Sequence, residues 1–254
     1  MTITYEIDDN GVLEVLMDNP PVNALGISDT EQIATIFESV TKNLDIKVAI
    51  LTAVGKGFCA GVDIKEIEDL PANEGILRIN KSCYDAFASI YECAVPVIIA
   101  VNDFCLGSGV GLAGAADIVL AAKGAQFGLP EVDNGALGAL THLARLVPQQ
   151  RARQMLYTCE TAAAEELKDY GSVYEVLPPE KLLTHAREIA IKIASKPSTT
   201  IRAAKESANG IELVNIRNSY RFEQGFTYEL NLAGEGEKAR QAFIDGKRLS
   251  LIHI

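Results

Sequence analysis

The sequence lacks a basic cluster and any long apolar run. Its 254 residues include 23 Lys and Arg against 34 Asp and Glu, a formal net charge of −11, and the basic residues are scattered. Such a charge repels polyanions, so we expect no nucleic-acid partner and no binding to anionic membrane surfaces. Because the apolar runs are too short to span a bilayer, we also expect no membrane segment.

The cysteines of the chain form no recognisable motif. Its five cysteines are odd in number and show no C-x-x-C spacing: Cys59, Cys83, Cys93, Cys105 and Cys159. This favours free thiols in a reducing compartment, and we expect no metal centre. The stretch "MTITYEIDDNGVLEV" has neither a basic n-region nor an apolar h-region, so we expect no signal peptide. These absences predict a cytoplasmic protein.

The remaining composition, 48% hydrophobic and 22% charged, is that of a globular α/β protein. The strand and helix patterns alternate irregularly, without the steady rhythm of a doubly wound sheet. We expect an α/β core over residues 1–195 and a helical region over 196–254, whose many apolar faces indicate an oligomer. Strands are predicted over 3–7, 12–18, 47–53, 96–101, 117–122 and 171–177, and helices over 28–44, 80–94, 138–158, 180–196, 197–213, 215–234 and 235–248.

A glycine-rich stretch, "CLGSGVGLAGAAD" (105–117), follows an apolar strand pattern and is predicted to form a short helix. Its "GVGLAG" matches the G-x-G-x-x-G dinucleotide pattern, but only a very short helix fits before the next strand. The residue after that strand is Lys123, not the acid that would hold a ribose. Close packing of small residues remains one alternative. The other is that the stretch presents backbone N–H groups to an oxyanion.

A second glycine-containing loop, "GKGFCAGVDIKE" (55–66), also runs from a strand into a helix. Together with "AQFGLPEV" (125–132), the two loops resemble the crotonase superfamily of acyl-CoA enzymes, and the C-terminal region resembles its trimerisation helices. The resemblance covers nearly the whole chain. It implies an α/β crotonase-type spiral of ββα units and a homotrimer or hexamer. It also implies chemistry on an acyl-CoA thioester through a stabilised enolate, with no cofactor beyond the CoA of the substrate.

By this resemblance, the backbone N–H groups of Val62 and Ser108 are the oxyanion donors and Glu131 is the catalytic carboxylate. Gly107 and Gly109 leave room for the thioester to reach Ser108. Asp63 opens a helix and is also expected to be its N-cap. The expected CoA contacts are Lys56, Ala60, Asp63, Ile64, Lys65 and, from a neighbouring subunit, Lys247.

One departure from the family pattern bears on the reaction. Hydratases of the family place a first glutamate where this chain has Gly111, so only Glu131 of the usual pair is present. Adding water across a double bond needs both a base and an acid. His142 is the candidate for a second acid or base, and the alternative is a helix-surface or hydrogen-bonded histidine with a structural role. Asp133, two residues from Glu131, is a weaker candidate.

Segments including "GVDIKE", "YECAVPVIIAVN" and "GLPEVDNGALGALTHLARLVP" resemble one branch of the superfamily most. That branch hydrolyses a bicyclic β-keto acyl-CoA and opens the last rings of a bacterially degraded steroid. We therefore expect carbon–carbon bond hydrolysis with Glu131 as general base. The alternatives are an enoyl-CoA hydratase or 3-enoyl-CoA isomerase of fatty-acid-type β-oxidation, and a non-catalytic RNA-binding or scaffold protein. The negative charge and the intact oxyanion loops argue against the last.

Overall fold

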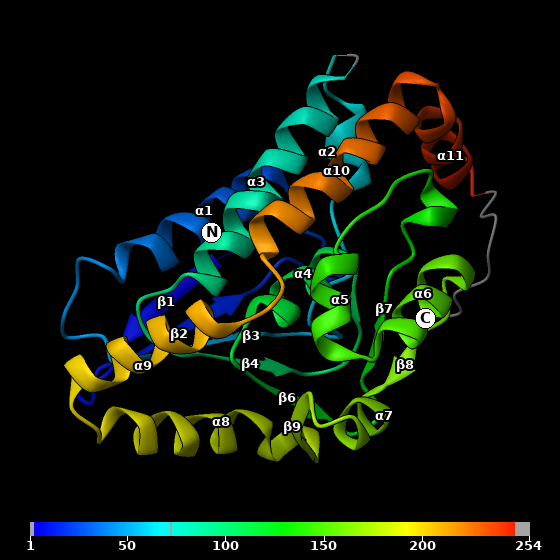
Figure 1. Ribbon diagram of the computed structural model, residues 1–254. Helices are drawn as coiled ribbons and strands as arrows, with labels where there is room; N and C mark the ends of the chain where they lie inside the picture. The colour runs from blue at the N-terminus through cyan, green and yellow to red at the C-terminus, as the bar shows by residue number, and fades with distance from the viewer. Residues whose placement is uncertain (1–2, 72, 247–254) are drawn as a thin grey trace.

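The computed structural model describes residues 3–71 and 73–246 (Figure 1). At its centre lies a six-stranded sheet with the strand order β1-β2-β3-β4-β6-β9. β1 and β2 form the predicted antiparallel hairpin, and the other neighbouring strands are parallel. Each strand lies within its predicted range: β1 (Ile3–Ile7), β2 (Val12–Met17), β3 (Val48–Ala53), β4 (Val97–Val101), β6 (Ile118–Ala122) and β9 (Val173–Leu177).

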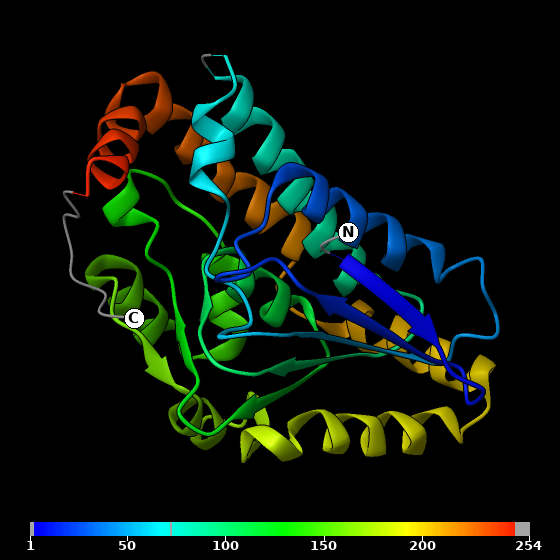
Figure 2. The ribbon, with the colours of Figure 1, turned by 180° about the vertical axis from the view of Figure 1, so that it is seen from behind.

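Helices cover both faces of this sheet, which is why its central strands read as continuous apolar runs. Figures 1 and 2 show α8 (Pro179–Ala194) along one face and α1 (Ile27–Ser39) and α3 (Glu74–Tyr91) on the opposite side. The face of α8 against the sheet consists of small and aliphatic residues three or four positions apart, Leu182, Ala186, Ala190 and Ala194. The remaining elements of the core are α2 (Ile64–Glu68), α4 (Ser108–Ala115), the 3-10 helix η1 (Val132–Asn134), α5 (Leu140–Leu146), α6 (Gln149–Thr158) and α7 (Ala164–Asp169).

Two features of the core differ from the sequence prediction. The helix expected over 138–158 is divided into α5 and α6, because Pro148 disfavours a helical conformation at Val147, which is extended. A second sheet, with the order β5-β7-β8, was not predicted. Its strands of two or three residues are too short to show a periodic pattern: β5 (Cys105–Leu106), β7 (Gln126–Gly128) and β8 (Ala162–Ala163).

The C-terminal region is helical, as predicted. The region consists of α9 (Ser198–Ile211), α10 (Ile216–Leu232) and α11 (Glu235–Ile244). α10 runs back along α3 and α5, and α11 lies against η1 and α2 (Figure 1). The last helices therefore pack on the core of their own chain, beside the two glycine-containing loops.

The five cysteines are buried free thiols, as the sequence predicted. None of the helices in the described part of the chain combines the length and apolarity needed to cross a membrane.

Candidate active site

The two glycine-containing loops lie side by side. The N–H of Leu106 donates to the carbonyl of Cys59 at 2.8 Å, and Cys59 and Cys105 form a parallel bridge. Gly107 has φ +55°, a conformation that favours glycine, and a Cβ there would lie 3.2 Å from the Cα of Gly61 and 2.8 Å from Oε1 of Glu131. The absence of a side chain at Gly107 is therefore what allows the two loops and the glutamate to meet.

The two predicted oxyanion donors line one cavity. Ser108 is the first residue of α4, so its N–H has no acceptor within the helix and lies at the positive end of the helix dipole. On either side of Val62, the carbonyl of Gly61 and the N–H of Asp63 bond to Leu25, each at 2.9 Å. Because backbone groups alternate in direction along an extended segment, the N–H of Val62 points away from Leu25.

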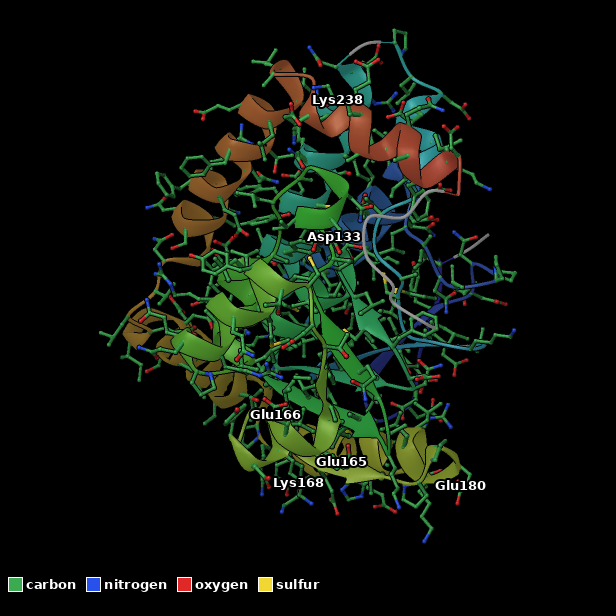
Figure 3. The ribbon with its side chains drawn as sticks, turned by 90° about the vertical axis from the view of Figure 1, so that its right-hand side faces the viewer. Asp133, Glu165, Glu166, Lys168, Glu180 and Lys238 are labelled. Atoms are coloured by element: carbon green, nitrogen blue, oxygen red, sulfur yellow. The ribbon has the colours of Figure 1, made fainter. Side chains whose placement is uncertain are left out.

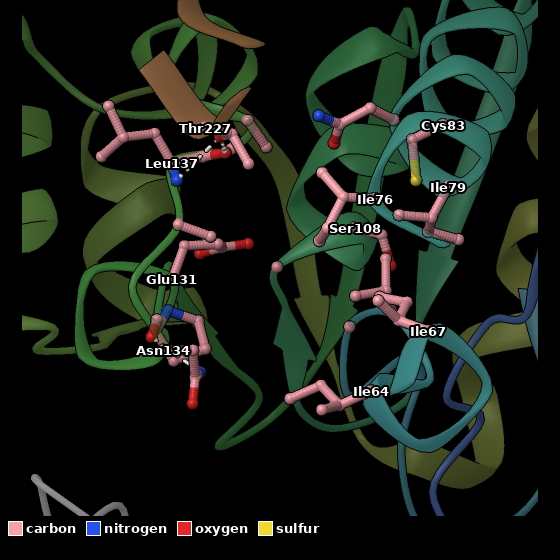
Figure 4. A pocket seen from close by; sticks show the side chains of 18 of the residues that line it. Ile64, Ile67, Ile76, Ile79, Cys83, Ser108, Glu131, Asn134, Leu137 and Thr227 are labelled. Atoms are coloured by element: carbon pink, nitrogen blue, oxygen red, sulfur yellow. Dashed lines mark hydrogen bonds between the residues drawn. The ribbon is translucent and has the colours of Figure 1, made fainter. Parts of the chain in front are cut away.

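The cavity has an apolar wall and a wall that carries the carboxylate (Figure 4). Ile76, Ile79 and Cys83 of α3 lie on one side, and Glu131 and its loop lie on the other. Glu131 is the one carboxylate among the described residues that line the cavity. An apolar pocket with a single acidic group suits a thioester whose reacting carbon needs one proton-transfer group.

Glu131 directly precedes η1, as its N-cap residue. The residue as a whole is half-buried, but Oε2 is enclosed and has no hydrogen-bond partner among the described residues. Burial raises the pKa of this carboxyl from 4.5 to about 8, and the negative charge of Glu223 adds to the shift. The group can therefore lose and regain a proton near neutral pH.

The loop after Glu131 is held by α10. Thr227 Oγ1 donates to the carbonyl of Leu137 at 2.6 Å and accepts from its N–H at 3.0 Å. The carboxylate of Glu223 accepts from the N–H groups of Leu140 and Thr141 at 2.7 and 3.1 Å, which caps α5. The sequence analysis missed both Glu223 and Thr227, since their partners are 82 to 90 positions away and leave no local pattern.

The surroundings of Gly111 show why this position carries no glutamate. It lies in α4, and a Cβ on it would overlap the ring of Phe87 from α3. Phe87 itself lines the cavity. The space that a second glutamate would enter is therefore filled by an aromatic ring.

His142 lies behind this ring. It is fully buried, its ring centroid is 5.0 Å from that of Phe87 and 4.9 Å from that of Tyr220, and neither ring nitrogen has a hydrogen-bond partner among the described residues. Burial lowers the pKa of His142 to about 3, so the imidazole is neutral at pH 7. Phe87 and Tyr220 line the cavity and His142 does not. The structure does not bring this predicted acid or base to the cavity.

Asp133 also lies outside the cavity lining. Its segment is a helical turn, and Asp133 lies beside the thiol of Cys159. Figure 3 shows it on the side of the molecule that also carries Lys238 of α11 and Glu166 of α7.

The predicted CoA-contact residues fall into four groups. Ala60 and Ile64 line the cavity. Asp63 is the N-cap of α2, as expected, and accepts from the N–H groups of Lys65 and Glu66 at 3.0 and 3.4 Å. Lys56 and Lys65 are exposed on the first loop and at the start of α2. Lys247 lies outside the described residues.

The chain is similar to known proteins. Residues 8–249 match the family described as enoyl-CoA hydratase/isomerase. Two relatives are named (7aS)-7a-methyl-1,5-dioxo-2,3,5,6,7,7a-hexahydro-1H-indene-carboxyl-CoA hydrolase. The one from Rhodococcus jostii is 50% identical over 96% of this chain and 95% of its own. The one from Mycobacterium tuberculosis is 46% identical over 96% of this chain and 99% of its own.

Solved structures agree with the fold. The crystal structure of an enoyl-CoA hydratase from Bacillus anthracis is 31% identical, with a TM-score of 0.77 over 98% of both chains. An enoyl-CoA hydratase from Mycobacterium avium subsp. paratuberculosis K-10, 24% identical, superposes with a TM-score of 0.85 over 95% of this chain and 98% of its own. The fold is the predicted crotonase fold, and the chain belongs to the enoyl-CoA hydratase/isomerase family of crotonase-type enzymes.

Proposed function

We propose that the protein hydrolyses a carbon–carbon bond in the ring of a bicyclic acyl-CoA that carries a β-keto group and a second oxo group. The observation that supports this most is the single carboxylate: Glu131 faces the cavity, while the ring of Phe87 fills the space beside Gly111. Hydration requires two proton-transfer groups, whereas attack of water on a ketone can begin with one. Two hydrolases among the relatives are named for a dioxo-hexahydroindene-carboxyl-CoA, a bicyclic acyl-CoA with two oxo groups.

In this reaction, ionised Glu131 takes a proton from water as the water oxygen bonds to the β-keto carbon. The bond from that carbon to the α-carbon of the thioester then breaks, and its electron pair forms an enolate. The thioester oxygen, now negative, accepts hydrogen bonds from the N–H groups of Val62 and Ser108, a contact worth about 10²- to 10³-fold in rate per donor. Glu131 returns its proton to the α-carbon. The sum is addition of one water, and the former ketone ends as a carboxylic acid that ionises.

The cofactor requirement, the CoA contacts and the oligomeric state belong to the same proposal. The reaction transfers protons and adds water without any net oxidation or reduction, so it needs no cofactor beyond the CoA of the substrate. We propose that Lys56 and Lys65, exposed on and just after the loop that carries Val62, pair with the phosphates of CoA. We also propose a homotrimer or hexamer in the cytoplasm, in which Phe222 and Phe226, 73% and 41% exposed on α10, are covered by a neighbouring subunit.

The test compares three thioesters with the purified protein. A dioxo-hexahydroindene-carboxyl-CoA should yield a ring-opened product that retains CoA and gains the mass of one water. Crotonyl-CoA should keep its conjugated absorbance, and a 3-enoyl-CoA should not isomerise. The Glu131→Gln variant should lose about 10²- to 10⁴-fold in turnover while still binding CoA thioesters. Rapid hydration of crotonyl-CoA, or unchanged turnover in the variant, contradicts the proposal.

A further inference from the structure

One polar side chain interrupts the apolar wall of the cavity. The cavity-lining face of α3 consists of residues three or four positions apart, Ile76, Ile79, Asn80, Cys83 and Phe87. Asn80 is the only one of these whose side chain carries strong hydrogen-bonding groups. A leucine at this position would fit the pattern of the face better, so the amide needs a separate explanation.

The amide of Asn80 has an unused donor. Its Nδ2 atom is enclosed and has no hydrogen-bond partner among the described residues. The backbone carbonyl of Asn80, by contrast, accepts from Nε2 of Gln224 on α10 at 2.6 Å, which fixes the residue in place. An enclosed donor without an acceptor costs free energy unless a ligand satisfies it.

The other polar side chains of the cavity wall have partners of their own. Thr227 bonds to the backbone of Leu137, as described above. Asn134 Nδ2 donates to the carbonyl of Pro130 at 3.0 Å. Arg240, from α11, is ion-paired with Glu68 of α2. Within the described residues, the cavity therefore combines one unpaired amide donor, at Asn80, with the unpaired acceptor Oε2 of Glu131.

These two atoms belong to opposite walls. Asn80 belongs to α3, and Glu131 faces α3 across the cavity. In Figure 4, Ile79, which precedes Asn80 on α3, lies on the side opposite Glu131. The water that attacks the β-keto carbon is held at Glu131, and the thioester oxygen is held at Val62 and Ser108. A donor on the α3 wall remains for another acceptor of the acyl group.

We propose that Nδ2 of Asn80 donates a hydrogen bond to the second, non-reacting carbonyl of the acyl group. Asn80 is then a specificity-determining residue that selects a diketone over a ring system with one ketone. The inference rests on the proposed function for the identity of the thioester. A ketone oxygen is an acceptor with no proton to give, which matches an amide N–H that has no other partner.

The test measures binding and turnover separately. Dissociation constants are measured by calorimetry for two thioesters: a dioxo-hexahydroindene-carboxyl-CoA, and its analogue with a methylene in place of the non-reacting oxo group. The protein is the Glu131→Gln variant, alone and combined with Asn80→Leu or Asn80→Ala. Both substitutions remove the amide donor, and leucine does so at similar volume. Neither change removes the backbone carbonyl that bonds Gln224.

With Asn80 present, the dioxo thioester should bind about 10- to 100-fold more tightly than the analogue. Both substitutions should abolish this ratio by weakening the dioxo thioester alone, while the analogue binds as before. An unchanged ratio, or equal weakening of both thioesters, overturns the assignment of Asn80.

Turnover by the protein with Glu131 intact separates this inference from the proposed function. Ring opening with an unchanged binding ratio leaves the hydrolase and removes the role of Asn80. Lack of ring opening, with a binding ratio that depends on Asn80, removes the hydrolase and keeps carbonyl recognition by Asn80.

Discussion

Replacing Glu131 by Gln should stabilise the protein, and the gain should depend on pH. Burial raises the pKa of this carboxyl from 4.5 to about 8, so the folded protein binds its proton more tightly than the unfolded chain does. The stability that Glu131 contributes is therefore fully present below about pH 4.5 and is lost as the pH rises through about 8. Glutamine has a similar shape and does not ionise.

The size of the effect follows from the pKa. Ionising the enclosed carboxyl costs the folded protein about 4–5 kcal/mol more than the unfolded chain. At pH 7 this cost lowers the free energy of unfolding by about 3 kcal/mol, because the carboxyl of the unfolded chain is ionised there and that of the folded protein is mostly not. E131Q should thus match the parent protein near pH 4.5 and exceed it by about 3 kcal/mol at pH 7.

The assay is chemical denaturation at about pH 5, 7 and 9, with one protein concentration throughout because association adds to stability. Exposed Glu206 on α9 offers a matched control, and Glu206→Gln should change the free energy of unfolding by less than about 0.5 kcal/mol at each pH. If the difference between E131Q and the parent protein is the same at all three values, the carboxyl is not buried as the structure has it, and the reasoning fails.

Gly111→Ala should destabilise the protein by about 1–3 kcal/mol in thermal or chemical unfolding, because its Cβ overlaps the ring of Phe87. Gly210→Ala on α9, where a Cβ meets no atom within 4 Å, should not destabilise it. His142→Phe should leave turnover within a factor of a few, and a loss of about 100-fold would reinstate His142 as an acid or base. In the parent protein, kcat/KM should rise with pH up to about 8, as Glu131 ionises. Glu223→Gln should move this profile to lower pH, because it removes a charge that raises the pKa of Glu131; an unmoved profile argues against that coupling.

Much of the architecture could be predicted because its signals are local. The continuous apolar runs of β3 and β4 are the pattern of strands covered on both faces. The paired glycine-containing loops and "LPEV" are short segments that resemble those of the crotonase superfamily, and this resemblance implied Val62, Ser108 and Glu131 before the fold was known. All three line the same cavity.

What could not be predicted depends on residues that meet only after folding. His142 has the chemistry of a proton carrier, but the rings of Phe87 and Tyr220 separate it from the cavity and leave it neutral. Thr227 fixes the loop after Glu131 through a hydrogen bond to Leu137, which lies 90 positions away in the sequence.

By itself, then, the sequence determined the kinds of element, their order, and the three groups proposed to act on the thioester. The tertiary structure alone decided which further residues reach the cavity and how strongly Glu131 holds its proton. The physical reason is that an element's type depends on neighbouring residues, whereas burial and a shifted pKa depend on every segment that closes around a group.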